Sequence, residues 1–192
     1  MKYLKKLICI VLTAGMLATV GCQNKTETNV NVYDENNPAP TQASKQEIKS
    51  VLNEKAELDG MSLTVISAEN PDIIMQNTGK QALFFQVEIN NQTEETVTAN
   101  YLNNFSLTVD GTEYDSDKCC TIPVMKELYD FYGISAMAEE IPAGESRTGY
   151  IACEADKNFK EISLHYTPKI NNIDSRITVE LSSDNITPAA KN

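Results

Sequence analysis

The chain has 192 residues and a formal net charge of −11, from 27 acidic and 16 basic side chains. An acidic protein without a basic stripe is a poor partner for nucleic acid or anionic lipid head groups, so we expect no nucleic-acid binding. The absence of tryptophan and the small number of phenylalanines predict an aliphatic core supplemented by tyrosine.

The first 21 residues have the pattern of an export signal. Lys2, Lys5 and Lys6 precede a short apolar run over residues 7–20, and Gly21-Cys22 closes the run. The run is too short to span a bilayer, which takes roughly 20 apolar residues. We therefore interpret residues 1–21 as a cleaved signal rather than as part of the fold.

Residues 18–22, Ala-Thr-Val-Gly-Cys, resemble the lipobox of bacterial lipoproteins, although Thr19 stands where that pattern usually has leucine. The resemblance implies that Cys22 is acylated and becomes the mature N-terminus. It also implies a lipid anchor on the extracytoplasmic face of the cell membrane. The alternative is ordinary secretion, because Thr19 and Gly21 are also small enough for a general signal peptidase.

Residues 22–55 are expected to form a flexible spacer. Residues 23–45 are polar, rich in Asn, Thr and Pro, and too poor in large apolar groups to offset the entropy of ordering. Within 44–56, Ile48, Val51 and Leu52 have helical spacing, and Ser44 with Glu47 resembles a capping box. This pattern predicts a short helix at the end of the spacer.

Residues 56–183 show the alternation of apolar and polar side chains that is typical of strands exposed on one face. In 83–89, for example, Leu83 and Phe85 point one way while Phe84 and Gln86 point the other. Asp110-Gly111 predicts a hairpin turn. The fold class is therefore all-β, an antiparallel β-sandwich followed by a flexible tail over 184–192. Strands are expected at 61–67, 83–89, 105–109, 147–153, 162–166 and 177–181.

The order of these motifs resembles the telokin-like, immunoglobulin-fold domain of unknown function found in Gram-positive lipoproteins and secreted proteins. That domain is related to the mycobacterial immunoprotective extracellular protein. The resemblance covers about residues 57–182 and implies an immunoglobulin-like sandwich in an exported setting, with no catalytic residues to transfer. The chain departs from it at Cys153, where a large core residue is expected, and at 123–139, which is longer than the usual connection. The matching segments are 60–65, 85–91, 105–111 with Tyr114, 141–144 and 149–153.

Three cysteines remain once Cys9 leaves with the signal and Cys22 carries lipid: Cys119, Cys120 and Cys153. In an exported chain, a disulfide from either adjacent cysteine to Cys153 is a reasonable expectation. The alternative is that Cys153 is a small buried apolar residue. We expect no metal site and no cofactor, because zinc usually takes four Cys or His ligands and His165 is the only histidine.

The sequence predicts no catalytic residues. His165 is expected on the polar face of its strand, where an imidazole is most often solvated. Gly133-Ile134-Ser135 lacks the second glycine of a nucleophile elbow. The acidic turn 110–117 does not follow the twelve-residue calcium loop, so a hairpin is favoured there, and a calcium or small-ligand receptor is kept as the alternative function.

The segment 123–139 interrupts the strand pattern and predicts a helical insertion. Tyr129, Phe131 and Tyr132 are candidate partner contacts, because aromatic side chains are enriched at protein interfaces. The alternative is that helical spacing turns Leu128, Tyr129 and Tyr132 into the core, in which case Phe131 faces outward. The expected function is non-catalytic binding of a protein or glycan at the cell envelope.

Overall fold

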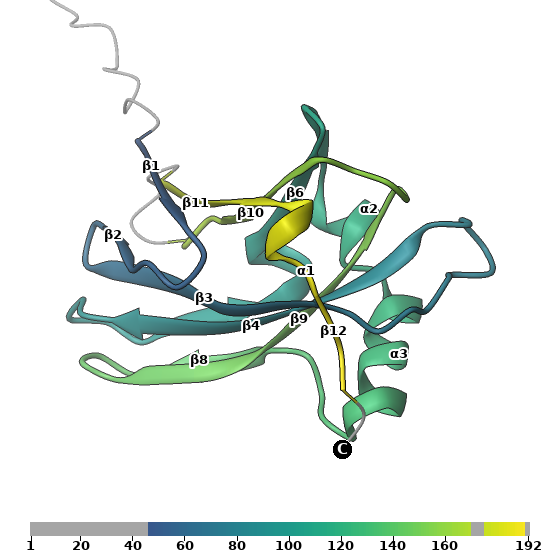
Figure 1. Cartoon of the computed structure of the whole chain (residues 1–192). Coiled ribbons are helices and arrows are strands. Elements are labelled where there is room, and N and C mark those ends of the chain that lie inside the picture. Colours follow the sequence, from purple (N-terminus) through teal and green to yellow (C-terminus); the bar gives the residue numbers. More distant parts are fainter. Residues whose placement is uncertain (1–45, 170–174, 191–192) are drawn as a thin grey trace, which may run out of the picture. The chain divides into compact units, whose positions relative to one another are not determined.

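The structure is a computed structural model that describes residues 46–169 and 175–190, in which the strands form two five-stranded sheets and a two-stranded ribbon (Figure 1). Cys22 and the expected signal and spacer up to residue 45 lie outside the described residues. The first sheet has the order β1 (Glu47–Val51), β11 (Arg176–Ser182), β10 (Glu161–Tyr166), β6 (Phe105–Val109) and β7 (Thr112–Tyr114). The second has the order β12 (Thr187–Pro188), β3 (Met61–Asn70), β4 (Gln81–Asn91) and β9 (Ser146–Ala155), with β2 (Ala56–Leu58) paired to β3. The ribbon joins β5 (Val97–Asn100) and β8 (Ala138–Ile141).

The expected all-β sandwich is confirmed. Within each sheet the central strands pair antiparallel, and the alternating apolar side chains of β4 and β9 meet those of β6, β10 and β11 in one buried cluster. Leu83 and Phe85 of β4 are fully buried, as are Leu107 of β6 and Leu164 of β10. This is the packing of two sheets face to face that period-two patterning predicts.

The hairpin expected at Asp110-Gly111 is also confirmed. The two residues join β6 to β7, and both have positive φ, 45° and 80°. Two-residue hairpin loops of this twist need such angles, which aspartate tolerates and glycine adopts freely. The Asp110 carboxylate accepts hydrogen bonds from the backbone N–H groups of Lys160 and Glu161, at 3.0 and 2.9 Å. The turn is thereby tied to the connection between β9 and β10.

The helix expected within 44–56 is wrong. Residues 47–51 form strand β1, which pairs in parallel with β11 from Glu47 opposite Arg176 to Val51 opposite Glu180. Ile48 and Ser50 are half-buried while their neighbours are exposed, which is a strand pattern. A helix of so few residues is only marginally stable by itself. Pairing with the edge of a sheet instead gives the backbone groups on one side of the segment hydrogen-bond partners.

The tail expected over 184–192 is ordered in the part that the structure describes. Residues Ser183–Asn185 form the 3-10 helix η1, which carries a capping box between Ser182 and Asn185. Strand β12 then pairs in parallel with the end of β3, with Thr187 opposite Glu69. Both ends of the sandwich domain therefore extend beyond the expected 56–183.

Helices α1 (Tyr101–Asn104), α2 (Ser116–Cys119) and α3 (Ile122–Tyr132) accompany the strands. Helix α3 occupies the predicted insertion; it begins after Thr121, whose side chain caps Val124 N–H, and ends at Gly133 with φ 73°. Such a left-handed end is the usual place for glycine. Among the described residues, no helix has both the length and the apolar character that crossing a membrane requires.

Helix α3 also corrects the expected polar face of β4. The alternation puts Phe84 with Gln86 on the polar face, but Phe84 is fully buried. Its ring lies 5.8 Å from that of Phe131 and 5.9 Å from that of Tyr132, both at the end of α3. The helix therefore covers this part of the outer face of the second sheet.

Candidate functional site

The three aromatic residues proposed as partner contacts separate into two groups. Phe131 and Tyr132 pack inward, with their rings 4.9 Å apart, and Tyr132 also contacts the ring of Tyr150 at 5.4 Å. The expectation that Phe131 faces outward is therefore wrong. The Tyr132 hydroxyl donates to the Glu69 carboxylate, and burial together with this bond raises the pKa of Tyr132.

Tyr129 points to solvent. Its side chain is 56% exposed, and Ile122, two turns earlier on the same face of α3, is 71% exposed. Between them lies Lys126, which pairs with Asp130. The alternative that placed Tyr129 in the core is thus wrong. We call Ile122 and Tyr129 the outer face of α3.

A buried carboxylate lies under the start of α3. Glu154 of β9 is fully buried and accepts hydrogen bonds from the hydroxyls of Thr78, at 2.6 Å, and Thr121. Since Thr121 is the N-cap of α3, the negative charge lies at the positive end of the helix dipole. This arrangement joins the β3–β4 loop, the edge strand β9 and the helix.

The three remaining cysteines come together. Cys119 and Cys120, at the end of α2, and Cys153 of β9 are all fully buried, and the three sulfur atoms lie within 4.8 Å of one another. The Sγ atom of Cys120 is 3.6 Å from that of Cys119 and 3.4 Å from that of Cys153, so the structure has three free thiols. Interaction with the thiol of Cys120, followed by that of Cys153, lowers the pKa of Cys119. Interaction with Cys119 and Cys120, together with burial, raises the pKa of Cys153. The pairing expected from sequence remains a prediction.

His165 was expected to be solvated on the polar face of β10, and this is wrong because the side chain is buried. Its Nε2 atom lies 2.7 Å from the Thr108 hydroxyl, and its Nδ1 atom lies 2.9 Å from that of Thr178, which donates in turn to Glu47. Burial, followed by the charge of Arg176, lowers the pKa of His165 to about 4. The network links β6, β10, β11 and β1. The imidazole therefore connects neighbouring strands.

The acidic turn does not form a carboxylate cluster in the part of the chain that is described. There, the cysteine trio is the one group of three candidate ligand residues that lie close enough together to hold an ion. Asp110 is committed to two backbone N–H groups, which lower its pKa. Tyr114 donates to Asp156, and Lys118 lies 3.8 Å from Asp115. These contacts serve the turn rather than a cation.

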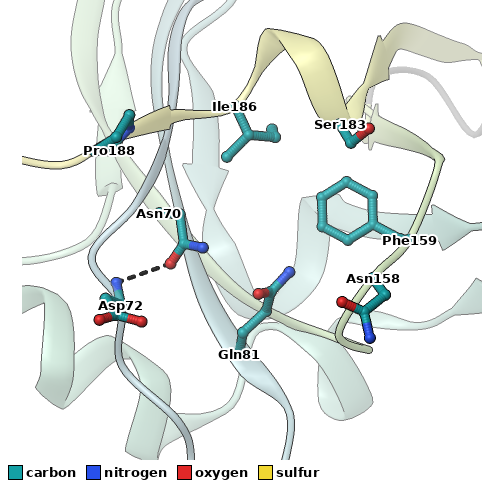
Figure 2. A pocket seen from close by; sticks show the side chains of 8 residues that line it. All are labelled: Asn70, Asp72, Gln81, Asn158, Phe159, Ser183, Ile186 and Pro188. Atoms are coloured by element: carbon teal, nitrogen blue, oxygen red, sulfur yellow. Dashed lines mark hydrogen bonds between the residues drawn. The ribbon is translucent and has the colours of Figure 1, made fainter.

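A cavity of about 470 Å³ lies between the β3–β4 connection, the β9–β10 turn and the C-terminal segment (Figure 2). Figure 2 shows the ring of Phe159 pointing inward from the β9–β10 turn, and the Asn70 amide oxygen accepting the N–H of Asp72 at 2.8 Å. Asp72 supplies the one charged side chain of the lining, and amides supply most of its polar groups. The full lining is Asn70, Asp72, Gln81, Asn158, Phe159, Ser183, Ile186 and Pro188.

The sequence reasoning missed this cavity and Glu154. The positive φ angles of Asp72 and Asn158 belong to turns that residues 70–72 and 156–158 indicate by composition. Turn signals of this kind place residues at one end of a sandwich without saying which turns meet. For Glu154, the one available signal was an acidic residue within the otherwise apolar run 151–155.

The geometry defines an antiparallel β-sandwich with an added helix, and family comparison agrees. Residues 50–176 match the family described as Domain of unknown function (DUF4352), and the chain belongs to that family. Membership confirms the expected resemblance to a domain of unknown function. No curated protein matches the chain significantly.

Solved structures with the same fold come from several bacteria. The ycdA protein of Bacillus subtilis, described as a candidate lipoprotein, superposes with a TM-score of 0.51 at 15% identity. The alignment covers 70% of this chain but only 40% of that one. The secreted protein MPT63 of Mycobacterium tuberculosis gives 0.48 at 14% identity, covering 72% of this chain and all of that one. A candidate lipoprotein of Staphylococcus aureus gives 0.46 at 12% identity, with coverage of 72% and 95%. At such identities the likeness concerns the fold alone.

The buried His165 predicts a pH dependence of stability. Its folded pKa, about 4, lies below the value of about 6.5 in an unfolded chain, so the folded state binds fewer protons between these values. The contribution of neutral His165 to the free energy of unfolding is complete above about pH 6.5. It declines as the pH falls towards 4, by at most roughly 3 kcal/mol. Urea unfolding at pH 7, 5.5 and 4.5 measures this decline. The His165→Gln variant, which keeps hydrogen-bonding groups but does not titrate, should show a smaller decline. Parallel curves for the two proteins would contradict the assignment.

Proposed function

We propose that the chain is a lipid-anchored, extracytoplasmic binding module without catalytic activity. The signal-like residues 1–21, the lipobox-like sequence ending at Cys22 and the polar spacer after it support the anchor and the location. Family membership supports a sandwich domain presented on that spacer. The buried, hydrogen-bonded state of His165 supports a non-catalytic role, because its imidazole is withdrawn from solvent.

The proposal of a protein partner rests on the outer face of α3. A large aliphatic and a large aromatic side chain, Ile122 and Tyr129, lie exposed on one helix face, next to the ion pair of Lys126 and Asp130. Tyrosine at the centre of an interface buries a large area at a small cost in side-chain entropy. A charged pair beside such an anchor suits the polar rim of an interface.

A small polar ligand in the cavity of Figure 2 is the second candidate function. A concave site lined by amides, one carboxylate and one aromatic ring suits a neutral ligand with several hydroxyl or amide groups, such as a saccharide. A calcium ion suits the cavity less well than a neutral ligand does. Calcium prefers several carboxylate oxygens, and the cavity lining offers only the carboxylate of Asp72.

The anchor is tested by the Cys22→Ser variant of the full chain. A serine cannot form the thioether that carries the diacyl chain, so we expect at least a tenfold shift of protein from the membrane fraction to the medium or soluble envelope fraction. Thr19→Leu, which completes the usual lipobox, is the matched control and should keep the protein at the membrane. An unmodified amine at the N-terminus of wild-type protein in the medium would overturn the proposal.

The partner surface is tested with a photoreactive phenylalanine analogue at position 129. We expect crosslinked adducts of defined mass in intact cells from this position, and none from the same analogue at Glu57. Glu57 is an exposed residue of β2, at the opposite end of the sandwich from α3 (Figure 1). Tyr129→Ala should weaken capture of the crosslinked protein at least tenfold, while the unfolding free energy changes by no more than about 0.5 kcal/mol. Equal crosslinking at both positions would contradict a specific surface. Phe131→Ala is not a suitable probe, because it would leave a gap against Phe84.

The cavity is tested by thermal unfolding with chitooligosaccharides as the neutral, amide-bearing probe. A ligand at 100 times its Kd stabilises the folded state by about 2.7 kcal/mol, which raises the Tm by several degrees. The Gln81→Ala variant should lose this rise. Gln86→Ala, on the same strand but outside the cavity, should keep it. No rise with saccharide, together with a rise on adding calcium ion, would favour the cation receptor instead.

A further inference from the structure

The cysteine trio is the most unusual chemical grouping in the described chain. Three fully buried sulfur atoms from two segments meet in one place, and none of the three residues is exposed to solvent. The Cys119 thiol also lies 3.4 Å from the backbone oxygen of Tyr114, which can accept its S–H group. A buried trio of thiols in an exported protein can hold a soft metal ion, form a disulfide or remain reduced.

Metal binding fits the trio poorly. Zinc in closed sites takes four Cys or His ligands, and the only histidine of the chain is hydrogen-bonded to Thr108 and Thr178. Three thiolates around Zn²⁺ or Cu⁺ would leave a net negative charge in a fully buried site, which is costly without a cationic partner.

Geometry distinguishes the three pairs of sulfur atoms. Adjacent residues have Cα atoms about 3.8 Å apart, below the usual 4.4–6.8 Å range of disulfides, which disfavours a Cys119–Cys120 bond. Cys120 and Cys153 have their Sγ atoms 3.4 Å apart, close enough to bond after a movement of roughly 1.4 Å. The Sγ atom of Cys119 lies near the backbone oxygen of Tyr114 and the Sγ atom of Cys120. Cys120, not Cys119, therefore makes the short sulfur contact with Cys153.

We propose that Cys120 and Cys153 form a disulfide in the exported protein, and that Cys119 stays a buried thiol beside it. The two thiols give up two protons and two electrons to a disulfide oxidant of the glutathione or thiol-oxidoreductase class, which is reduced to two thiols. The bond joins the C-cap of α2 to the edge strand β9 and encloses α3 and β8 in one covalent loop. It therefore fixes the base of the helix whose outer face is the proposed partner surface. The oxidising environment rests on the proposed extracytoplasmic location, whereas the choice of pair rests on geometry alone.

The pairing is tested on the full chain carrying Cys9→Ser and Cys22→Ser, so that Cys119, Cys120 and Cys153 are its only cysteines, unfolded and refolded in a buffer of reduced and oxidised glutathione. We expect an intact mass about 2 Da below that of the fully reduced chain, and a Cys120–Cys153 link in the peptide map without reductant. Cys119→Ser should keep the mass deficit, and Cys153→Ser should lose it. Closing a loop of this length should raise the Tm by roughly 10 °C over the reduced protein, and by a similar amount in Cys119→Ser.

Several results would overturn the pairing. These are three free thiols at 119, 120 and 153 in the refolded protein, a link through Cys119, or one equivalent of retained copper or zinc. The wild-type mass and peptide map decide the question even if Cys153→Ser does not fold. Protein isolated from the cell envelope is examined in parallel. A link that forms on refolding but is absent from native protein would count against the proposed location and leave the pairing intact.

Discussion

The contact between α3 and the outer face of β4 and β9 determines how the inserted segment is arranged on the sandwich. An antiparallel sheet usually exposes one face to water, and the sequence of β4 puts Phe84 on that face. Helix α3 covers it with Phe131 and Tyr132, and the hydroxyl of Tyr132 reaches Glu69 on β3. Burying one phenylalanine contributes on the order of 2 kcal/mol, so this aromatic cluster is a substantial part of what holds the helix.

The start of the same insertion crosses the edge of the second sheet. Successive residues of a strand point to opposite faces, so Cys153 and Glu154 lie on opposite sides of β9. Cys120 contacts the first and Thr121 contacts the second, which places the crossing between two adjacent residues of the insertion. An exposed edge strand invites pairing with other chains. Here the crossing and the parallel bridge from Ala136 to Tyr150 cover the edge of β9.

Local patterns predicted what depends on local chemistry. Alternation located the central strands, and Asp110-Gly111 located a hairpin, because side-chain period and turn angles are properties of a few neighbouring residues. Strand β1 depends on pairing with β11, far along the chain, and its own residues carry a weak helical pattern instead. His165 alternates onto the predicted polar face, but Thr108 and Thr178 on neighbouring strands enclose it.

For α3, the spacing identified a helix with one apolar side but not which aromatics belong to that side. The buried stripe runs through Val124 and Leu128 and continues with the partly buried Phe131, which turns Tyr129 outward.

The two candidate binding surfaces share one buried connection. The β3–β4 loop carries Asp72 and ends at Gln81, both of which line the cavity, and Thr78 in the same loop donates to Glu154. Glu154 accepts a second bond from Thr121, the N-cap of α3. A fully buried carboxylate is stable only while its hydrogen-bond donors remain in place, since desolvating the charge without them is expensive. The loop at the cavity and the N-cap of the helix therefore both donate a hydrogen bond to the same buried carboxylate.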